Sequence, residues 1–127
     1  MSLNTVWRHV SCTSNWWNKN YKEIRVVESK ETDFSFLSKP GVFGWNKVDQ
    51  GSELLIANLS TLFTQRKPPV NILDIGCGYG YLSIHCAQLF SCAITACDNN
   101  SAAVDSCDEN FRQRHISGQV IATNCTQ

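Results

Sequence analysis

The chain has 127 residues, of which 43% are hydrophobic, and its formal net charge at pH 7 is zero. This length fits a single domain with a folded core, and the neutral balance excludes a polybasic surface over the whole chain. The charge is uneven, since residues 1–67 hold nine Lys or Arg against six Asp or Glu, and residues 68–127 hold two against five. A polyanion would therefore meet the N-terminal half more readily. We find no signal peptide or transmembrane run and expect a cytoplasmic protein.

Residues 1–39 are predicted to form an N-terminal extension. Their first part has no clear period but places aromatic side chains beside lysines. These residues are Trp7, Trp16, Trp17, Lys19, Tyr21 and Lys22. Aromatics interleaved with lysines can stack on bases and contact phosphates, although we prefer packing of the aromatics on the domain. Residues 23–27 and 33–37 have the pattern of two short strands joined by a polar connection, which predicts a hairpin.

Residues 40–67 predict a loop followed by a helix. Pro40 and Gly41 open the loop. The helix is expected to run from about Ser52, a good N-cap residue, to about Gln65. Its apolar face consists of Leu55, Leu59, Leu62 and Phe63, with Leu54 and Ile56 beside it. The pair of prolines that follows prevents the helix from continuing.

The stretch 70–80 predicts a buried strand that runs into a glycine-rich turn. Residues 70–75 form a short apolar run with an acid, Asp74, near its end, which is typical of a parallel strand covered on both faces. Glycine then occupies every second position, at Gly76, Gly78 and Gly80. A helix follows to about Phe90 and would aim its first N–H groups at a ligand above the strand. We therefore predict a ligand-binding turn.

The spacing of this turn narrows the class of ligand. A Walker phosphate loop requires Lys and Ser or Thr after its last glycine, and a dinucleotide fingerprint requires G-x-G-x-x-G, whereas this chain has G-x-G-x-G. Asp74, two residues before the first glycine, would disfavour a pyrophosphate and suits a cationic ligand group. The pattern D-x-G-x-G-x-G at the end of a strand resembles motif I of the class I S-adenosylmethionine-dependent methyltransferases. A glycine-rich turn that binds nothing is the alternative.

The remaining residues repeat the alternation of strand and helix. Residues 92–97 predict a second buried strand that ends at Asp98, a helix runs from residue 100 or 101 to about Gln113, and residues 119–123 predict a third strand that ends at Asn124. Strands that alternate with helices form a parallel sheet with right-handed crossovers. We expect an α/β fold with helices on both faces of a sheet in the order 3-2-1, which is half of a doubly wound, Rossmann-like sheet.

The ends of these strands mark the expected site, because open α/β sheets bind ligands beyond the carboxyl ends of their strands. Asp98 lies 18 residues after Gly80, near the position at which an acid meets a ribose diol in such folds. Its two oxygens match two hydroxyl donors. Asn99 and Asn124 are candidates for the adenine pocket. The alternative for Asp98 is a polar residue that only initiates a helix.

The cysteines and histidines give no sign of a metal site. The seven cysteines contain no Cys-x-x-Cys pair and are Cys12, Cys77, Cys86, Cys92, Cys97, Cys107 and Cys125. We interpret them as buried free thiols in a reducing compartment. His9, His85 and His115 are isolated in the sequence, so each is expected to be a surface or packing residue. We therefore predict no metal.

The resemblance extends beyond the turn. It includes Pro40-Gly41-Val42-Phe43-Gly44, Asp49-x-Gly51-Ser52-x-Leu54-Leu55, residues 72–83, Cys97-Asp98 and Ala122-x-Asn124. With these segments the chain resembles the "small" methyltransferase domain and, within it, the family of the bacterial ribosomal RNA small-subunit methyltransferase C. That family methylates the exocyclic N2 amine of a guanine in 16S rRNA. The resemblance therefore implies S-adenosylmethionine as cofactor and ribosomal RNA or the small ribosomal subunit as partner.

The resemblance also implies roles for individual residues. Asp74 would face the methionyl ammonium, and Asp98 would hold the ribose. The turn residues that would admit the cofactor to the backbone are Gly76, Cys77, Gly78 and Gly80, and those that would contact adenine are Asn99 and Asn124. A front flap near the cofactor or the RNA would include Phe43, Lys47 and Ser52. No catalytic residue is identified.

The chain departs from this family at its C-terminal side. The family's Asn-Pro-Pro motif, which holds the target amine, follows the fourth strand, and the sequence stops at Gln127 before it. We therefore expect residues 40–127 to be the cofactor-binding half of a C-terminally truncated methyltransferase. The alternatives are an inactive cofactor-binding fragment or interaction module, and a related methyltransferase that acts on adenine or protein glutamine. Without a fourth strand, the strand at 70–75 has an open edge, so we expect marginal stability, a homodimer or a fragment of a longer protein.

Overall fold

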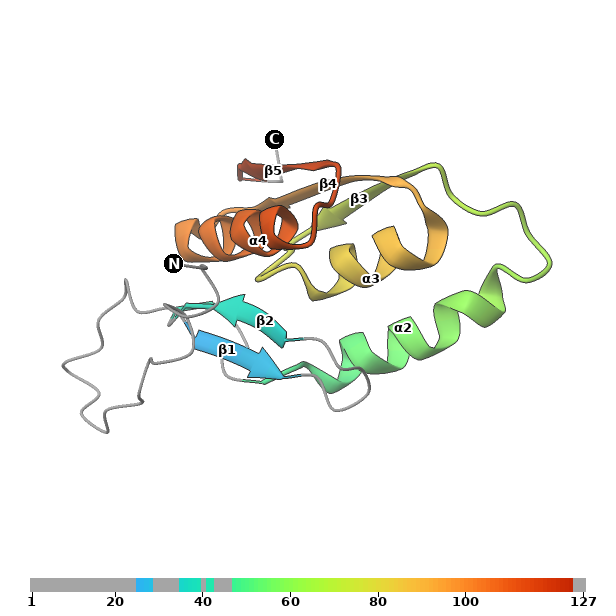
Figure 1. Cartoon of the computed structure of the whole chain (residues 1–127), viewed down its shortest axis with the longest axis horizontal. Coiled ribbons are helices and arrows are strands. Elements are labelled where there is room, and N and C mark those ends of the chain that lie inside the picture. Colours follow the sequence, from blue (N-terminus) through green and yellow to red (C-terminus); the bar gives the residue numbers. More distant parts are fainter. Residues whose placement is uncertain (1–24, 29–34, 40, 43–46, 125–127) are drawn as a thin grey trace.

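The computed structural model describes residues 25–28, 35–39, 41–42 and 47–124 of the chain (Figure 1). The aromatic and lysine residues predicted within residues 7–22 lie outside these ranges, as does Phe43 of the expected front flap. The elements in chain order are β1 (Arg25–Glu28), β2 (Ser35–Ser38), α2 (Gln50–Leu62), β3 (Asn71–Ile75), α3 (Tyr81–Phe90), β4 (Ala93–Asp98), α4 (Ser101–Gln113) and β5 (Gly118–Ala122).

The main sheet is parallel and has the order β3-β4-β5. The predicted α/β class and the 3-2-1 strand order are thus confirmed. The register pairs Ile75 with Cys97 and Asp98 with Ala122, so the carboxyl ends of the three strands lie at one edge of the sheet. Backbone bonds fix this edge, since the Gly76 N–H donates to the Cys97 carbonyl over 2.8 Å and the Thr123 N–H donates to the Asp98 carbonyl over 3.0 Å.

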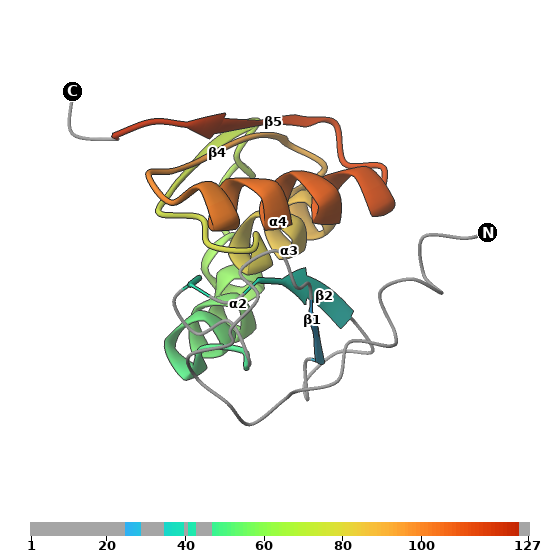
Figure 2. The ribbon, with the colours of Figure 1, turned by 90° about the vertical axis from the view of Figure 1, so that its left-hand side faces the viewer.

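The helices α2, α3 and α4 lie on the same side of this sheet in both views (Figures 1 and 2). The prediction of helices on both faces is therefore wrong for the part of the chain that the structure describes. The strand order explains the difference, because β3, β4 and β5 advance across the sheet in one direction. Successive right-handed crossovers in one direction place their helices on one face, and only a reversal of direction reaches the other.

The outer face of the sheet is apolar and open to solvent in the described structure. Leu73 and Ile75 of β3 are each 61% exposed, and Ile121 of β5 is 41% exposed. The expectation of strands buried on both faces is accordingly wrong on this side. Among the described strands β3 pairs with β4 alone, so the expected open edge is present. Marginal stability and dimerisation stay predictions.

The helix α2 begins two residues earlier than expected. Its N-cap is Asp49, whose carboxylate accepts hydrogen bonds from the backbone N–H of Ser52 over 2.9 Å and from the Ser52 hydroxyl over 3.1 Å. Ser52 is thus a first-turn residue and not the N-cap. Asp49 has an extended backbone, and its carboxylate caps the N–H of Ser52 three residues further along the chain. The helix ends at Leu62, three residues before the predicted Gln65.

The antiparallel pair β1–β2 is joined to the main sheet through α4 (Figure 2). The Asn110 side chain of α4 accepts from the Leu37 N–H over 2.7 Å and donates to the Leu37 carbonyl over 2.8 Å. The Asn110 amide also donates to the Tyr79 carbonyl over 2.7 Å, in the glycine-rich turn. Phe36 of β2 is fully buried among the rings of Tyr79, Tyr81 and His85. One buried amide therefore links the hairpin to the turn that follows β3.

Candidate functional site

A cleft of about 330 Å³ lies beyond the carboxyl ends of β3 and β4. It is lined by the turn after β3, the residues that follow β4, Ala103 of α4, the start of α3, and a front segment that includes Gly41, Lys47, Asp49 and Ser52. The structure brings seven of the eight predicted cofactor-binding residues to or beside this cleft. Those that line it are Asp74, Gly76, Cys77, Gly78, Asp98 and Asn99. Gly80 lies directly behind them as the N-cap of α3.

The three glycines of the turn all have left-handed backbone conformations, with φ of 73° at Gly76, 55° at Gly78 and 95° at Gly80. Their surroundings differ. A Cβ atom on Gly80 would lie 2.9 Å from the Cys107 sulfur on α4, whereas a Cβ on Gly76 would meet no atom within 4 Å. Gly80 is therefore required by the packing of α4 on the turn, and Gly76 leaves the cleft open beside the backbone.

The N–H groups of the turn are largely used within the protein. Those of Gly76 and Cys77 donate to the Cys97 carbonyl, and that of Gly80 donates to the Cys77 carbonyl over 2.9 Å. The Gly78 N–H donates to Asp98 Oδ2 over 3.0 Å. The turn thus supplies a surface that a ligand can approach closely, and not a set of donors such as a phosphate loop provides.

Asp74 is a half-buried carboxylate on the cleft side of β3. Its Oδ2 accepts a hydrogen bond of 2.6 Å from the Ser83 hydroxyl of α3. Burial raises the pKa of the Asp74 carboxyl, the hydrogen bonds from Ser83 lower it in part, and the nearby Asp98 charge raises it further. Burial and the Asp98 charge both disfavour the ionised form of Asp74. A cationic ligand group beside it would favour that form, so the site is suited to a cation.

Asp98 holds the turn while it faces the cleft. Its Oδ1 accepts from the Asn100 N–H over 2.9 Å, and its Oδ2 accepts from Gly78. Each carboxylate oxygen retains a further lone pair, so these bonds leave acceptor capacity for ligand hydroxyls. Neither Asp98 nor Asp74 takes part in an ion pair among the described residues. Two acidic groups therefore converge on one cleft, and neither forms an ion pair with a described residue.

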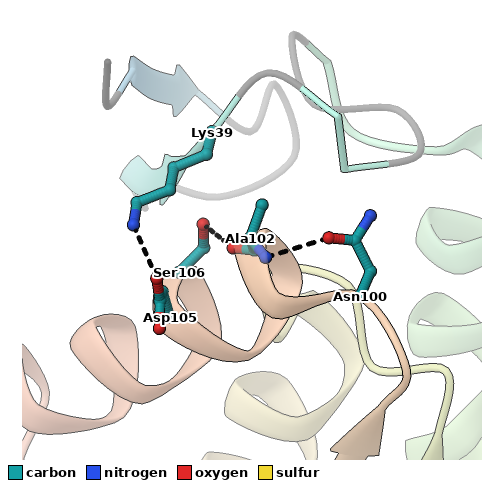
Figure 3. Close-up of polar contacts among 5 residues, drawn as sticks. All are labelled: Lys39, Asn100, Ala102, Asp105 and Ser106. Atoms are coloured by element: carbon teal, nitrogen blue, oxygen red, sulfur yellow. Dashed lines mark hydrogen bonds and ion pairs between the residues drawn. The ribbon is translucent and has the colours of Figure 1, made fainter. Parts of the chain in front are cut away.

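Asn100 is a cleft residue that sequence reasoning treated only as the start of a helix. Its Oδ1 accepts from the Ala102 N–H over 2.9 Å and caps α4 (Figure 3). Its Nδ2 donates to the Gly41 carbonyl over 2.8 Å and so fastens the front segment to the end of β4. The ion pair of Lys39 with Asp105, at 2.9 Å, connects the residue after β2 to the helix α4 (Figure 3). The preference of Asn for N-cap positions could have predicted the capping role of Asn100 from the sequence. No local pattern in the sequence indicates its bond to Gly41.

Two further predictions for the site have different outcomes. Lys47 and Ser52 of the expected flap line the cleft, and the Lys47 carbonyl accepts a hydrogen bond of 3.2 Å from the Tyr79 hydroxyl. Burial raises the pKa of that hydroxyl, so it stays a neutral donor. Asn124 is exposed after β5 and does not line the cleft. Its contact with adenine stays a prediction.

The thiols near the cleft are packing groups. Cys77 and Cys107 are buried free thiols, and Cys86 on α3 is buried as well. Burial raises the pKa of Cys86 to about 11. The pKa of Cys107 is also raised, mainly by its hydrogen bond with Cys77 and to a smaller extent by burial. Within the described residues, no group of three or more His, Cys, Asp or Glu could hold a metal ion. No helix in that part of the chain is long and apolar enough to span a membrane.

Comparison with known families and curated proteins gives consistent matches. The model of the methyltransferase small domain matches residues 33–127. The chain is 33% identical over 107 residues to ribosomal RNA small subunit methyltransferase C of Haemophilus ducreyi, covering 84% of this chain and 30% of that protein. It is 36% identical over 104 residues to the uncharacterized protein YbxB of Bacillus subtilis, covering 81% of this chain and 50% of that protein. The chain thus spans 30% and 50% of the lengths of these two relatives.

Solved structures share the fold. A 16S rRNA N2 methyltransferase from T. thermophilus, solved in complex with AdoMet and guanosine, superposes with a TM-score of 0.68 at 24% identity and covers 80% of this chain and 27% of that one. A tRNA uracil methyltransferase from Pyrococcus abyssi, in complex with S-adenosyl-L-homocysteine, gives a TM-score of 0.55 at 18% identity over 76% of this chain and 23% of that one. At these identities the likeness establishes the fold.

Proposed function

The chain belongs to the methyltransferase small domain family, and from this premise we propose that residues 40–127 are the S-adenosylmethionine-binding portion of a methyltransferase. The observation that carries the proposal is the convergence of Asp74 and Asp98 on one cleft beside a turn of left-handed glycines. S-Adenosylmethionine carries an ammonium and a sulfonium. These positive groups fit a cleft that contains two carboxylates, neither of which forms an ion pair with a described residue. S-Adenosylmethionine also carries a ribose diol, which fits the acceptor capacity of Asp98.

In this proposal each part of the cleft has its own role. Asp74 binds the methionyl ammonium, and Asp98 binds the ribose while its bond to Gly78 holds the turn. The bare backbone at Gly76 permits close approach, with Cys77 beside it, and Asn99 lines the adenine end. The cofactor supplies an activated methyl group on its sulfonium. The protein's part in such a transfer is mainly to hold the donor in line with an acceptor.

We further propose that the acceptor is the exocyclic N2 of guanine in 16S rRNA. The names of curated relatives and the guanosine complex of the T. thermophilus protein support this substrate. Incubation of the chain with labelled S-adenosylmethionine and small ribosomal subunits tests this acceptor, and label in guanine of the RNA would support it. Binding without transfer would favour the non-catalytic module, and label in adenine or in a protein glutamine would favour the related enzymes.

The cofactor site is tested by an isosteric substitution. Asp98→Asn keeps an acceptor oxygen but removes the charge, and should weaken S-adenosylhomocysteine binding, measured by calorimetry, by about tenfold or more. Asp108→Asn is the matched control, because Asp108 is on the exposed side of α4 and pairs with Arg112 over 2.7 Å. Equal affinity of Asp98→Asn and the unmodified protein would remove Asp98 from the site.

A further inference from the structure

The contact between α3 and the end of β3 contains a hydroxyl that motif-based reasoning leaves out. Ser83 is 1% exposed, and its Oγ donates to Asp74 Oδ2 over 2.6 Å, the shortest side-chain hydrogen bond described around the cleft. Charge-assisted O–H to carboxylate bonds have this length and are about twice as strong as bonds between neutral groups. The serine lies in the first turn of α3, so packing of α3 on β3 fixes the direction of the bond.

We propose that Ser83 is a positioning residue for the cofactor: its hydroxyl keeps the Asp74 carboxylate ionised and turned so that the other oxygen faces the cationic amine of the ligand. The inference rests on the proposed function, since it assumes that Asp74 binds the methionyl ammonium. Burial favours the neutral acid, and the hydrogen bond from Ser83 favours the carboxylate. Without the hydroxyl, the pKa of Asp74 should therefore rise further.

The other groups around Asp74 do not replace the hydroxyl. Asp98 adds a second negative charge and therefore opposes ionisation of Asp74. The thiols of Cys86 on α3 and Cys107 on α4 have raised pKa values and stay neutral near pH 7. Lys47 and Asp49 of the front segment line the same cleft but contribute charges of opposite sign. Of the described side chains, the Ser83 hydroxyl alone donates a hydrogen bond to Asp74.

The experiment follows ligand affinity against pH in Ser83→Ala. Below about pH 8, where an α-ammonium is still charged, affinity for S-adenosylhomocysteine should fall as acid protonates Asp74. This fall in affinity toward low pH is the acid limb of the profile. Loss of the hydroxyl should move the acid limb to higher pH, and at a pH within it the affinity should be about tenfold lower than that of the unmodified protein. Ser83→Thr, which retains the hydroxyl, should restore the limb toward its original position.

Two matched controls separate this effect from a change in packing. Ser106 on α4 is also a buried serine, at 2% exposed, but its hydroxyl donates to the Ala102 carbonyl of its own helix over 2.7 Å (Figure 3). Ser106→Ala should leave the pH profile unchanged. In an Asp74→Asn background Asp74 no longer titrates, so adding Ser83→Ala should not shift the pH profile further. If Ser83→Ala alone unfolds, the single Asp74→Asn variant still tests the inference, because a pH profile unchanged from that of the unmodified protein would show that Asp74 does not set it.

A second ligand distinguishes failure of this inference from failure of the proposed function. An adenosine thioether without the amino-acid group lacks the ammonium, so Ser83→Ala should leave its affinity and pH profile unchanged. If the unmodified protein binds neither ligand, the proposed function is wrong. If it binds S-adenosylhomocysteine and the acid limb of Ser83→Ala coincides with that of the unmodified protein, Ser83 does not position Asp74.

Discussion

Gly80 and Gly76 have the same kind of backbone conformation but different surroundings, and alanine at each should separate folding from binding. Any side chain at φ of 95° or 73° is strained, by about 1–3 kcal/mol. At Gly80 the added methyl also meets the Cys107 sulfur at 2.9 Å and the Phe111 ring at 3.6 Å, whereas at Gly76 it meets nothing within 4 Å. Overpacking of this kind adds about 1–3 kcal/mol, so Gly80→Ala should lose about 2 kcal/mol more stability than Gly76→Ala.

Urea unfolding measures this difference. With a slope of about 1–2 kcal/mol per M for a domain of this size, the midpoint for Gly80→Ala should lie roughly 1 M below that for Gly76→Ala. Gly76→Ala should instead lose affinity for S-adenosylhomocysteine, because its methyl projects where the cleft is open. Cys107→Ala should partly rescue Gly80→Ala, with a coupling energy of about 1 kcal/mol. Equal midpoints for the two glycine variants, or no coupling with Cys107, would refute the packing argument.

Two further predictions concern buried side chains of the helices. Burial, with the nearby Arg114 charge, lowers the pKa of His85 below 6.5; the folded state then binds fewer protons than the unfolded one, so the stability that neutral His85 provides should be lost as pH falls below 6.5. His85→Phe should flatten this dependence in melting curves taken between about pH 5 and 7, and an unchanged slope would contradict it. Asn110→Ala leaves the Leu37 N–H and the Leu37 and Tyr79 carbonyls without the Asn110 bonds, so it should cost about 3 kcal/mol and speed hydrogen exchange at the Leu37 amide. Retained protection at Leu37 would show that the amide does not hold the hairpin.

Local signals predicted the helices next to the site well. The bounds of α3 follow from a glycine turn at its start and from apolar spacing to Phe90, and α4 begins directly after Asn100, which caps it. The predicted bounds of β3, β4 and β5 differ from the observed ones by at most one residue, and those of β1 and β2 by at most two. Asp49 was missed as the N-cap of α2 because Asp and Ser are both good caps, and only the backbone geometry selects between them.

The parts that sequence could not predict depend on contacts between distant residues. Leu73 and Ile75 have the pattern of a strand buried on both sides, but a pattern does not state which element covers each side. Asn110 resembles any polar residue of an amphipathic helix, yet it is 2% exposed and joins β2 to the turn after β3. Its partners are 73 and 31 residues away, which no local period reveals. By contrast, Asp74 and Asp98 converge because parallel strands end at one edge.

The acid at Asp74 is unfavourable for the protein alone, which is itself an argument for a ligand. Its folded pKa is raised above the unfolded value, so the folded state binds more protons, and stability falls as pH rises through that interval. At neutral pH the ionised carboxylate therefore costs stability that a neutral side chain would not. A cation bound beside it reverses this sign, because an opposite charge favours the ionised form. Asp74 thus lowers the stability of the protein when the cleft is empty and raises it when a cation is bound. The Ser83 hydroxyl keeps the carboxylate ionised for that cation.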